Sequence, residues 1–168
     1  MTALIYLPPY WPDGSDLANA NLKPRLRMLA LYHLTNTKGL LVAGTGNKSE
    51  LLAGYFTKYG DGGVDILPLG GLYKHEVRTS ARELGVPVAI TEKAPSAGLW
   101  VDQTDEVEMG IAYDELNTIL EAIERGDAAS FRTQQGARVQ QIIADSEHKR
   151  HTPPIFDARE SLSTPEHR

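Results

Sequence analysis

Two short apolar segments, each followed by a stretch of helical spacing, constrain the fold of this chain most. Residues 40–43 (LLVA) end at a glycine-rich turn, and residues 64–67 (VDIL) follow another glycine-rich run. Strands that alternate with helices form βα units, and the strands of such units lie parallel in one sheet. The sequence therefore predicts an α/β fold with two parallel strands, the first of them buried.

Apolar residues at helical spacing predict five helices around these strands. We expect them over residues 21–35, 48–58 and 73–84, around residues 116–123 with an end at Gly126, and over residues 129–147. In the first, one stripe is formed by Leu22, Leu26, Leu29 and His33. Pro24 is tolerated in this helix because it falls in the first turn, where its missing N–H would have no partner.

Two strands are fewer than a parallel sheet normally contains, because sheets usually have about four or more. A lone pair also leaves both edges of the sheet open to pairing with other strands. We therefore expect further strands, supplied either upstream of this sequence or by a partner.

Composition narrows the function classes. The 168 residues suit one domain, with an irregular lead-in at residues 1–14 and a frayed tail at residues 158–168. No apolar run approaches the ~18 residues of a membrane span, and the net charge of −5 argues against a general nucleic-acid surface. The chain has no cysteine, which excludes disulfides and cysteine chemistry and fits a cytoplasmic location.

The sharpest local feature is residues 44–50 (GTGNKSE), directly after the first strand. Ligands of α/β folds bind beyond the carboxyl ends of strands, where the N–H groups of a helix start face anions. Thr45 would supply a hydroxyl there, and Glu50 an oxygen ligand suited to Mg²⁺. Alternatively, Thr45 or Asn47 caps the helix and Glu50 favours its positive end.

The following residues combine charged and aromatic side chains with glycines. Glu50, Gly54 and Lys58 share one face of the expected helix, and Gly54 would let a ligand approach the backbone. The alternative is a weak surface ion pair. In residues 55–65 aromatic rings could flank a base, Lys58 could meet a phosphate and Asp65 a hydroxyl, or the run is simply a glycine-rich turn.

Several cations could bind an anion. Lys74 lies in the first turn of its helix, where the dipole disfavours a cation unless an anion binds, although a solvated lysine costs little. Arg25 or Arg27 could grip a carboxylate or phosphate bidentately, or lie on the surface. Residues 148–151 (HKRH) could do the same or stabilise a helix end. These residues alone indicate a nucleotide-binding α/β domain.

Six stretches resemble the ammonia-dependent NAD synthetase family and occur in the family's order. They are residues 21–28 (NLKPRLRM), 44–50, 54–63 (GYFTKYGDGG), 95–100 (PSAGLW), 104–106 (TDE) and 147–150 (EHKR). The resemblance covers residues 15–157 as the C-terminal portion of a NAD synthetase domain. It implies an incomplete Rossmann-like parallel sheet of the adenine-nucleotide alpha-hydrolase type, with several flanking helices.

The resemblance implies a ligase that uses ATP and Mg²⁺ to amidate deamido-NAD with ammonia. ATP adenylates the nicotinate carboxylate, and ammonia then displaces AMP to give NAD. By the resemblance, the contacts with ATP are Thr45, Lys74 and Ser96, and Glu50 binds Mg²⁺. The contacts with deamido-NAD would be Arg25, Lys58, Asp65, His148 and Lys149. No residue is implied as a catalytic acid or base, and the family implies a homodimer.

The sequence departs from the family pattern at several places. Pro24 replaces a small residue, Gly71 stands where an acidic residue is common, and Ser96 keeps the hydroxyl of a frequent threonine. The family's Ser-Gly-Gly-x-Asp-Ser loop, which holds ATP phosphates and a second magnesium ligand, does not occur in this sequence. We therefore expect Met1 to be an internal start of a truncated or split gene product. The alternative function is an inactive fragment that binds nucleotide or pairs with a full-length synthetase.

Overall fold

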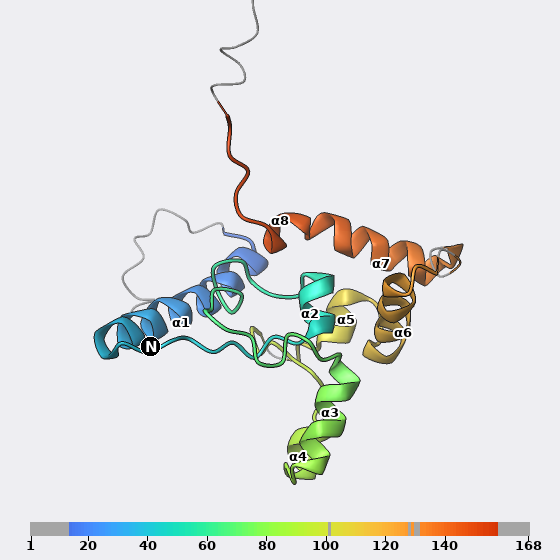
Figure 1. Cartoon of the computed structure of the whole chain (residues 1–168), viewed down its shortest axis with the longest axis horizontal. Helices are drawn as coiled ribbons and strands as arrows, with labels where there is room; N and C mark the ends of the chain where they lie inside the picture. The colour runs from blue at the N-terminus through green and yellow to red at the C-terminus, as the bar shows by residue number, and fades with distance from the viewer. Residues whose placement is uncertain (1–13, 101, 128, 130–131, 158–168) are drawn as a thin grey trace, which may run out of the picture.

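The computed structural model describes residues 14–100, 102–127, 129 and 132–157. The expected lead-in, Gly14 apart, and the expected tail at residues 158–168 lie outside these residues. The described part of the chain folds mainly into helices (Figure 1). They are α1 (Asp16–Lys38), α2 (Lys48–Ala53), α3 (Lys74–Glu83), α4 (Val88–Thr91), α5 (Asp105–Met109), α6 (Tyr113–Glu124), α7 (Gln134–Asp145) and α8 (Glu147–Arg150).

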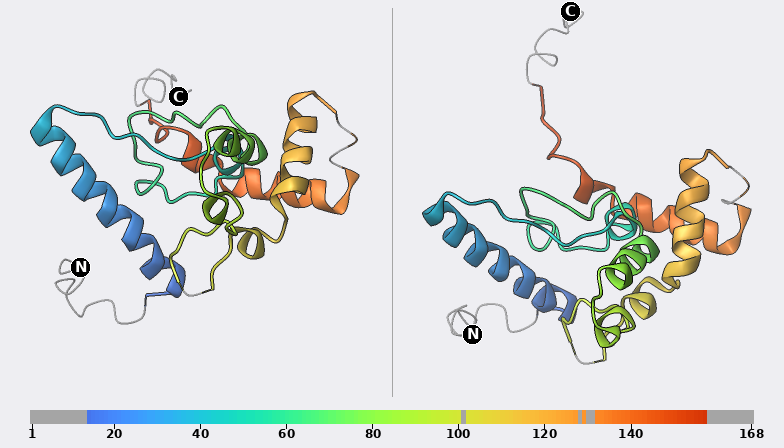
Figure 2. Two further views of the ribbon diagram at one scale, coloured as in Figure 1. Left: turned by 90° about the horizontal axis from the view of Figure 1, so that it is seen from below. Right: turned by 60° about the horizontal axis from the view of Figure 1, so that its bottom comes forward.

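Helix α1 begins earlier than its apolar pattern predicts. The Ser15 side chain accepts a hydrogen bond from the Ala18 N–H, so the helix starts at Asp16 rather than near residue 21. Pro24 therefore lies inside the helix, not in its first turn. The predicted apolar stripe is also wrong, because Leu29 is 59% exposed and His33 is exposed. Figure 2 shows why: α1 lies along one side of the molecule, far from α6 and α7.

The two predicted strands pair in the predicted direction, but only briefly. Ala43 and Ile66 form an isolated parallel bridge, in which the Gly44 N–H donates to the Ile66 carbonyl at 2.8 Å. No longer strand occurs among the residues that the structure describes. The first segment was expected to be buried, and Val42 is, whereas Leu40 and Leu41 are 57% and 67% exposed. Neither side chain belongs to the core, which lies elsewhere.

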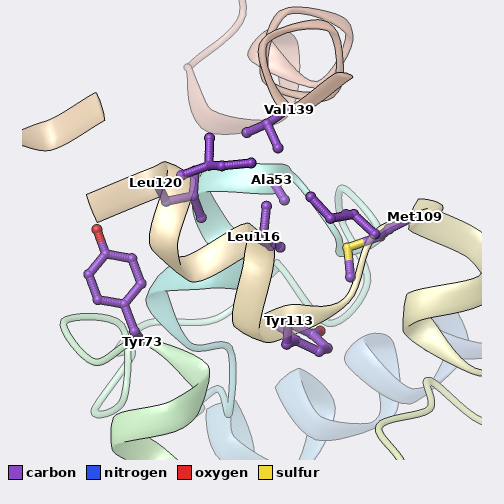
Figure 3. Close-up of a cluster of buried hydrophobic side chains, with 9 residues drawn as sticks. Ala53, Tyr73, Met109, Tyr113, Leu116, Leu120 and Val139 are labelled. Carbon is purple, nitrogen blue, oxygen red and sulfur yellow. The ribbon is translucent and has the colours of Figure 1, made fainter. Parts of the chain in front are cut away.

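The core instead forms around α6 (Figure 3). Its predicted apolar face is confirmed, because Leu116 and Leu120 are fully buried and point toward Ala53 of α2 and Val139 of α7. Tyr113 at the start of α6 is also fully buried. This packing fixes α2, the start of α3 and α5 around one another, and those are the elements that carry the candidate site.

Several predicted helix ends move inward. Helix α2 stops at Ala53, so Glu50, Gly54 and Lys58 do not share one helix face. Gly54 ends the helix with φ +64°, and a Cβ there would lie 2.1 Å from the Cβ of Ser146. The side on which a Cβ would lie is therefore filled by the α7–α8 junction. Gly54 also lines a cavity, so the approach of a ligand to its backbone stays a prediction. The last predicted helix is split into α7 and α8, and α4 was not predicted.

No helix in the described part of the chain combines the length and apolar character that a membrane crossing requires.

Candidate functional site

Two cavities are of interest for function. The larger, of about 390 Å³, is lined by the first half of α1, Thr45, residues 54–57, Asp61, the loop around residues 97–103, Glu108 and Lys149. The smaller, of about 320 Å³, lies between α3 and residues 86–96. Both cavities are lined by charged and apolar side chains together, which is the usual make-up of a small-molecule site.

An ion pair between Glu50 and Lys74 lies between these cavities. The Lys74 Nζ lies 2.8 Å from Glu50 Oε1, and both side chains are mostly buried. Glu50 also closes a capping box, because its Oε2 accepts from the Asn47 N–H while Asn47 Oδ1 accepts from the Glu50 N–H, each at 3.1 Å. The capping alternative is thus confirmed for Asn47 and Glu50. The unfavourable position of Lys74 at the start of α3 is relieved by Glu50.

A tyrosine and a second carboxylate extend this pair. The Tyr113 hydroxyl donates to Asp105 Oδ2 at 3.1 Å and lies 3.4 Å from Glu50 Oε1. Lys74 Nζ also lies 5.0 Å above the centre of the Tyr113 ring. Burial raises the pKa of Tyr113, so its hydroxyl stays protonated and remains a donor.

Asp105 carries an unusual buried oxygen. Its side chain is only 5% exposed, and Oδ1 has no hydrogen-bond partner among the described residues. Burial raises the pKa of this carboxyl, an effect that the Tyr113 hydrogen bond and Lys74 only partly oppose. The sequence analysis did not single out Asp105 or Tyr113 as site residues. The only available signal was the position of Asp105 within the resembling residues 104–106.

The lining of the larger cavity includes two cations, Arg27 and Lys149, and two carboxylates, Asp61 and Glu108. Lys149 Nζ donates to the carbonyls of Gly54 at 2.8 Å and Phe56 at 3.0 Å. Burial lowers the pKa of this ammonium group. On another wall, the Tyr55 hydroxyl donates to Glu108 Oε2 at 2.6 Å. The cavity therefore offers a partly desolvated cation to an anionic group of a ligand.

Four of the five residues predicted to contact deamido-NAD come together. Arg25 Nε donates to the Lys58 carbonyl at 3.4 Å, and Lys58 Nζ donates to the His148 carbonyl. Lys149 follows His148 directly, but it alone of the four lines the larger cavity. Arg27 lines that cavity and Arg25 does not, so Arg25, which the resemblance implies, stays a predicted contact with deamido-NAD.

Asp65, the fifth, lies apart from both cavities. Its Oδ1 accepts from the Tyr32 hydroxyl at 3.1 Å, and its Oδ2 accepts from the Val42 N–H at 2.7 Å. These bonds tie α1 to the parallel bridge, which gives Asp65 a structural role in this conformation.

The three residues predicted to contact ATP are divided between the cavities. Lys74 and Ser96 line the smaller cavity, from opposite walls, whereas Thr45 lines the larger. Ser96 Oγ accepts from the Gly98 N–H at 3.1 Å. Among the described residues, no group of three or more histidines or carboxylates is arranged to hold a metal. Glu50 is therefore a single candidate ligand that would need others from a substrate or water.

Comparisons with known proteins agree on one family. The NAD synthase family model matches residues 4–153. The NH(3)-dependent NAD(+) synthetase of Archaeoglobus fulgidus is 57% identical over 153 residues, which cover 89% of this chain and 60% of that protein. The NH(3)-dependent NAD(+) synthetase of Methanococcoides burtonii is 49% identical over 151 residues, covering 85% of this chain and 57% of that protein.

Two solved structures show the same likeness. The NMN synthetase from Francisella tularensis matches with a TM-score of 0.80 at 37% identity, over 92% of this chain and 62% of that one. The NH3-dependent NAD synthetase from Campylobacter jejuni matches with a TM-score of 0.71 at 28% identity, over 92% of this chain and 60% of that one. The chain thus spans about 60% of the length of these relatives.

Proposed function

The chain belongs to the NAD synthase family, and from that premise we propose that it serves the ATP-dependent amidation of deamido-NAD by ammonia. A carboxylate oxygen of the nicotinate attacks the α-phosphorus of ATP, and pyrophosphate leaves. Ammonia then attacks the activated carbonyl carbon, AMP leaves with that oxygen, and loss of a proton gives NAD. The observation that carries this proposal is the Glu50–Lys74 pair between a cavity with Lys149 and one with Ser96.

We assign the ATP phosphates to the smaller cavity. Lys74 presents a cation there and Ser96 a hydroxyl, which are the groups that bind phosphoryl oxygens. A cation held beside the α-phosphate stabilises the charge that develops as pyrophosphate leaves. Thr45, on the larger cavity, would then meet the part of ATP that faces the second substrate.

The larger cavity suits the nicotinate end of deamido-NAD. Lys149 has three donors and uses two of them on the Gly54 and Phe56 carbonyls, so one remains for a carboxylate. Arg25, Lys58 and His148 continue from Lys149 along one edge and would meet the remaining phosphates. Asp65 stays a predicted contact with deamido-NAD, and binding there would compete with its bond to Tyr32 of α1.

Glu50 fits magnesium as one ligand of a shared set. Mg²⁺ is commonly held by one or two carboxylates together with substrate phosphates and water. Lys74 and the metal would compete for Oε1, so we infer that Lys74 turns toward the phosphates when Mg²⁺ and ATP bind together. When bound, the metal would neutralise phosphate charge during adenylation.

We further propose that the parallel bridge belongs to a Rossmann-like sheet completed by strands outside the described residues, and that the protein pairs with a second copy or a synthetase chain. Exposed apolar side chains support such pairing, since Leu29, Leu31 and Leu34 of α1 are each about half exposed or more. A cytoplasmic location stays a prediction.

Two further candidates follow from specific observations. Glu50 and Lys74 satisfy one another without any ligand, which favours a protein that binds nucleotide but does not turn over. The likeness to the Francisella tularensis NMN synthetase favours a mononucleotide acid as the substrate instead of the dinucleotide.

Product formation separates these candidates. The purified chain is incubated with ATP, Mg²⁺, ammonia and either deamido-NAD or nicotinate mononucleotide, and the amide products are quantified by chromatography. We expect NAD from deamido-NAD, and a loss of at least about 100-fold in Glu50→Gln, as for removal of one transition-state ligand. Formation of NMN but not NAD would show that nicotinate mononucleotide is the substrate instead of deamido-NAD. ATP binding without either product would establish the nucleotide-binding candidate.

A further inference from the structure

We propose that Arg78 and Lys93 bind the phosphate chain of ATP together with Lys74, so that the smaller cavity holds an oligophosphate. This inference rests on the proposed function, because it assigns further residues to the site where ATP would bind. Neither residue was singled out from the sequence.

The lining of the smaller cavity has a strong excess of positive charge. Lys74 and Arg78 lie four residues apart on α3 and therefore on the same helix face, while Lys93 comes from the opposite wall. No aspartate or glutamate lines this cavity. Lys74 is paired with Glu50, but no carboxylate in the lining balances the charges of Arg78 and Lys93, so an anion bound near these two cations would be stabilised.

The hydrogen bonds and ion pairs among the described residues show which of the cations have no anionic partner. Arg78 is half-buried, yet neither it nor Lys93 has a hydrogen bond or ion pair among the described residues. Arg82, one turn further along α3, does not line the cavity and is paired with Glu92 at 2.8 Å. Glu92 thus balances the charge of Arg82 outside the cavity, whereas Arg78 inside it has no such partner among the described residues.

The chemistry of the lining fits a chain of phosphates better than a single anion. A planar guanidinium accepts two oxygens of one phosphate, whereas two ammonium groups act as separate point charges. Ser96 adds a hydroxyl, and Val77 and Val86 add apolar surface to the lining. An oligophosphate can reach all three cations at once, which one carboxylate cannot.

Calorimetric titration with tripolyphosphate and with ATP tests this assignment on the whole chain at low salt. We expect Arg78→Gln and Lys93→Gln each to weaken tripolyphosphate binding about tenfold, as for loss of one charge-assisted contact. Arg82→Gln is the matched control, because it removes a cation from the same helix outside the cavity, and it should change affinity less than about twofold. Lys93 is exposed, so Lys93→Gln should stay folded and still tests phosphate binding if Arg78→Gln unfolds.

The outcomes separate this inference from the proposed function. Wild-type protein that does not bind tripolyphosphate, or variants that bind it as wild type does, would overturn the assignment even if NAD is formed. A tenfold loss of tripolyphosphate affinity confined to the two cavity variants would support the assignment even if no NAD is formed. In that case only the proposed amidation would be contradicted. Loss for tripolyphosphate but not for ATP would also overturn the assignment to the ATP phosphates.

Discussion

Ser49 is the residue through which α2, α3 and α6 are joined. Its side chain is fully buried, and its Oγ donates to Asn117 Oδ1 at 2.5 Å while accepting from the Lys74 N–H at 2.9 Å. The start of α3, and with it the Lys74 side chain, is therefore held by a hydroxyl from the preceding helix.

Ser49→Ala should lower the free energy of unfolding by about 1–3 kcal/mol, because it leaves two buried polar groups without their partner. Urea denaturation measures this change. Thr118→Ala is a suitable control, since Thr118 is exposed and bonds only within α6, and it should cost less than about 0.5 kcal/mol. Equal losses of unfolding free energy in the two variants would show that the Ser49 hydrogen bonds stabilise the fold no more than an exposed bond does.

Asp105 makes stability depend on pH. Burial raises the pKa of its carboxyl in the folded state, so its stabilising contribution is complete below the ordinary carboxyl pKa and is lost as pH rises through the raised value. The stability of Asp105→Asn relative to wild type should therefore increase as pH rises above the ordinary carboxyl pKa of about 4. Urea unfolding of both proteins across this range gives the difference, and a difference that stays constant with pH would contradict the expectation.

At the residue scale the sequence identified charged residues but not their partners. Glu50 and Lys74 were each proposed to meet a ligand, yet nothing in their spacing of 24 residues revealed the ion pair between them. The sequence could not choose between Arg25 and Arg27, because both flank the same apolar helix positions. Asp105 and Tyr113 were missed because a carboxylate becomes unusual only through burial, which one sequence does not show.

At the scale of elements, a comparison of two glycines that end helices distinguishes the cost of backbone strain from the cost of a packing clash. Gly54 and Gly39 both adopt left-handed backbone angles, with φ of +64° and +63°. A Cβ at Gly54 would lie 2.1 Å from Ser146, whereas nothing lies within 4 Å of one at Gly39.

Gly39→Ala should therefore cost only the conformational term, about 1 kcal/mol, while Gly54→Ala adds the displacement of α8 and should cost several times more. Thermal unfolding of both variants measures the two costs. Because α8 carries Lys149, which lines the larger cavity, Gly54→Ala should also weaken deamido-NAD binding, and Gly39→Ala should not. Similar costs for both variants would mean that α8 adapts freely.

Burial of the apolar face accounts for the success at α6, and its exposure for the error at α1. The pattern of α6 was sufficient because Leu116 and Leu120 fill the core. The pattern of α1 misled because its leucines face outward, and its start depends on the Ser15 side chain instead. The parallel pairing was predictable from the βα order, but its length depends on neighbours that no local pattern supplies.

At the scale of the whole molecule, a chain of polar contacts leads from the smaller cavity toward the larger. Lys74 of the smaller cavity pairs with Glu50, and Tyr113 joins Glu50 to Asp105, which shares α5 with Glu108 of the larger cavity. A reaction that joins a carboxylate to a phosphate needs two such neighbouring sites. The family resemblance implied both substrates, but the sequence did not show that Thr45 and Lys74 would line different cavities.

The most direct test of this account is calorimetric titration of wild type and Lys149→Met with deamido-NAD, with NAD as the matched ligand that lacks the carboxylate charge. We predict that wild type prefers deamido-NAD, and that Lys149→Met loses about tenfold in affinity for it together with the preference, because the carboxylate loses one charge-assisted bond. Equal binding of both ligands by wild type, or unchanged binding by Lys149→Met, would contradict the assignment of the larger cavity to the nicotinate carboxylate.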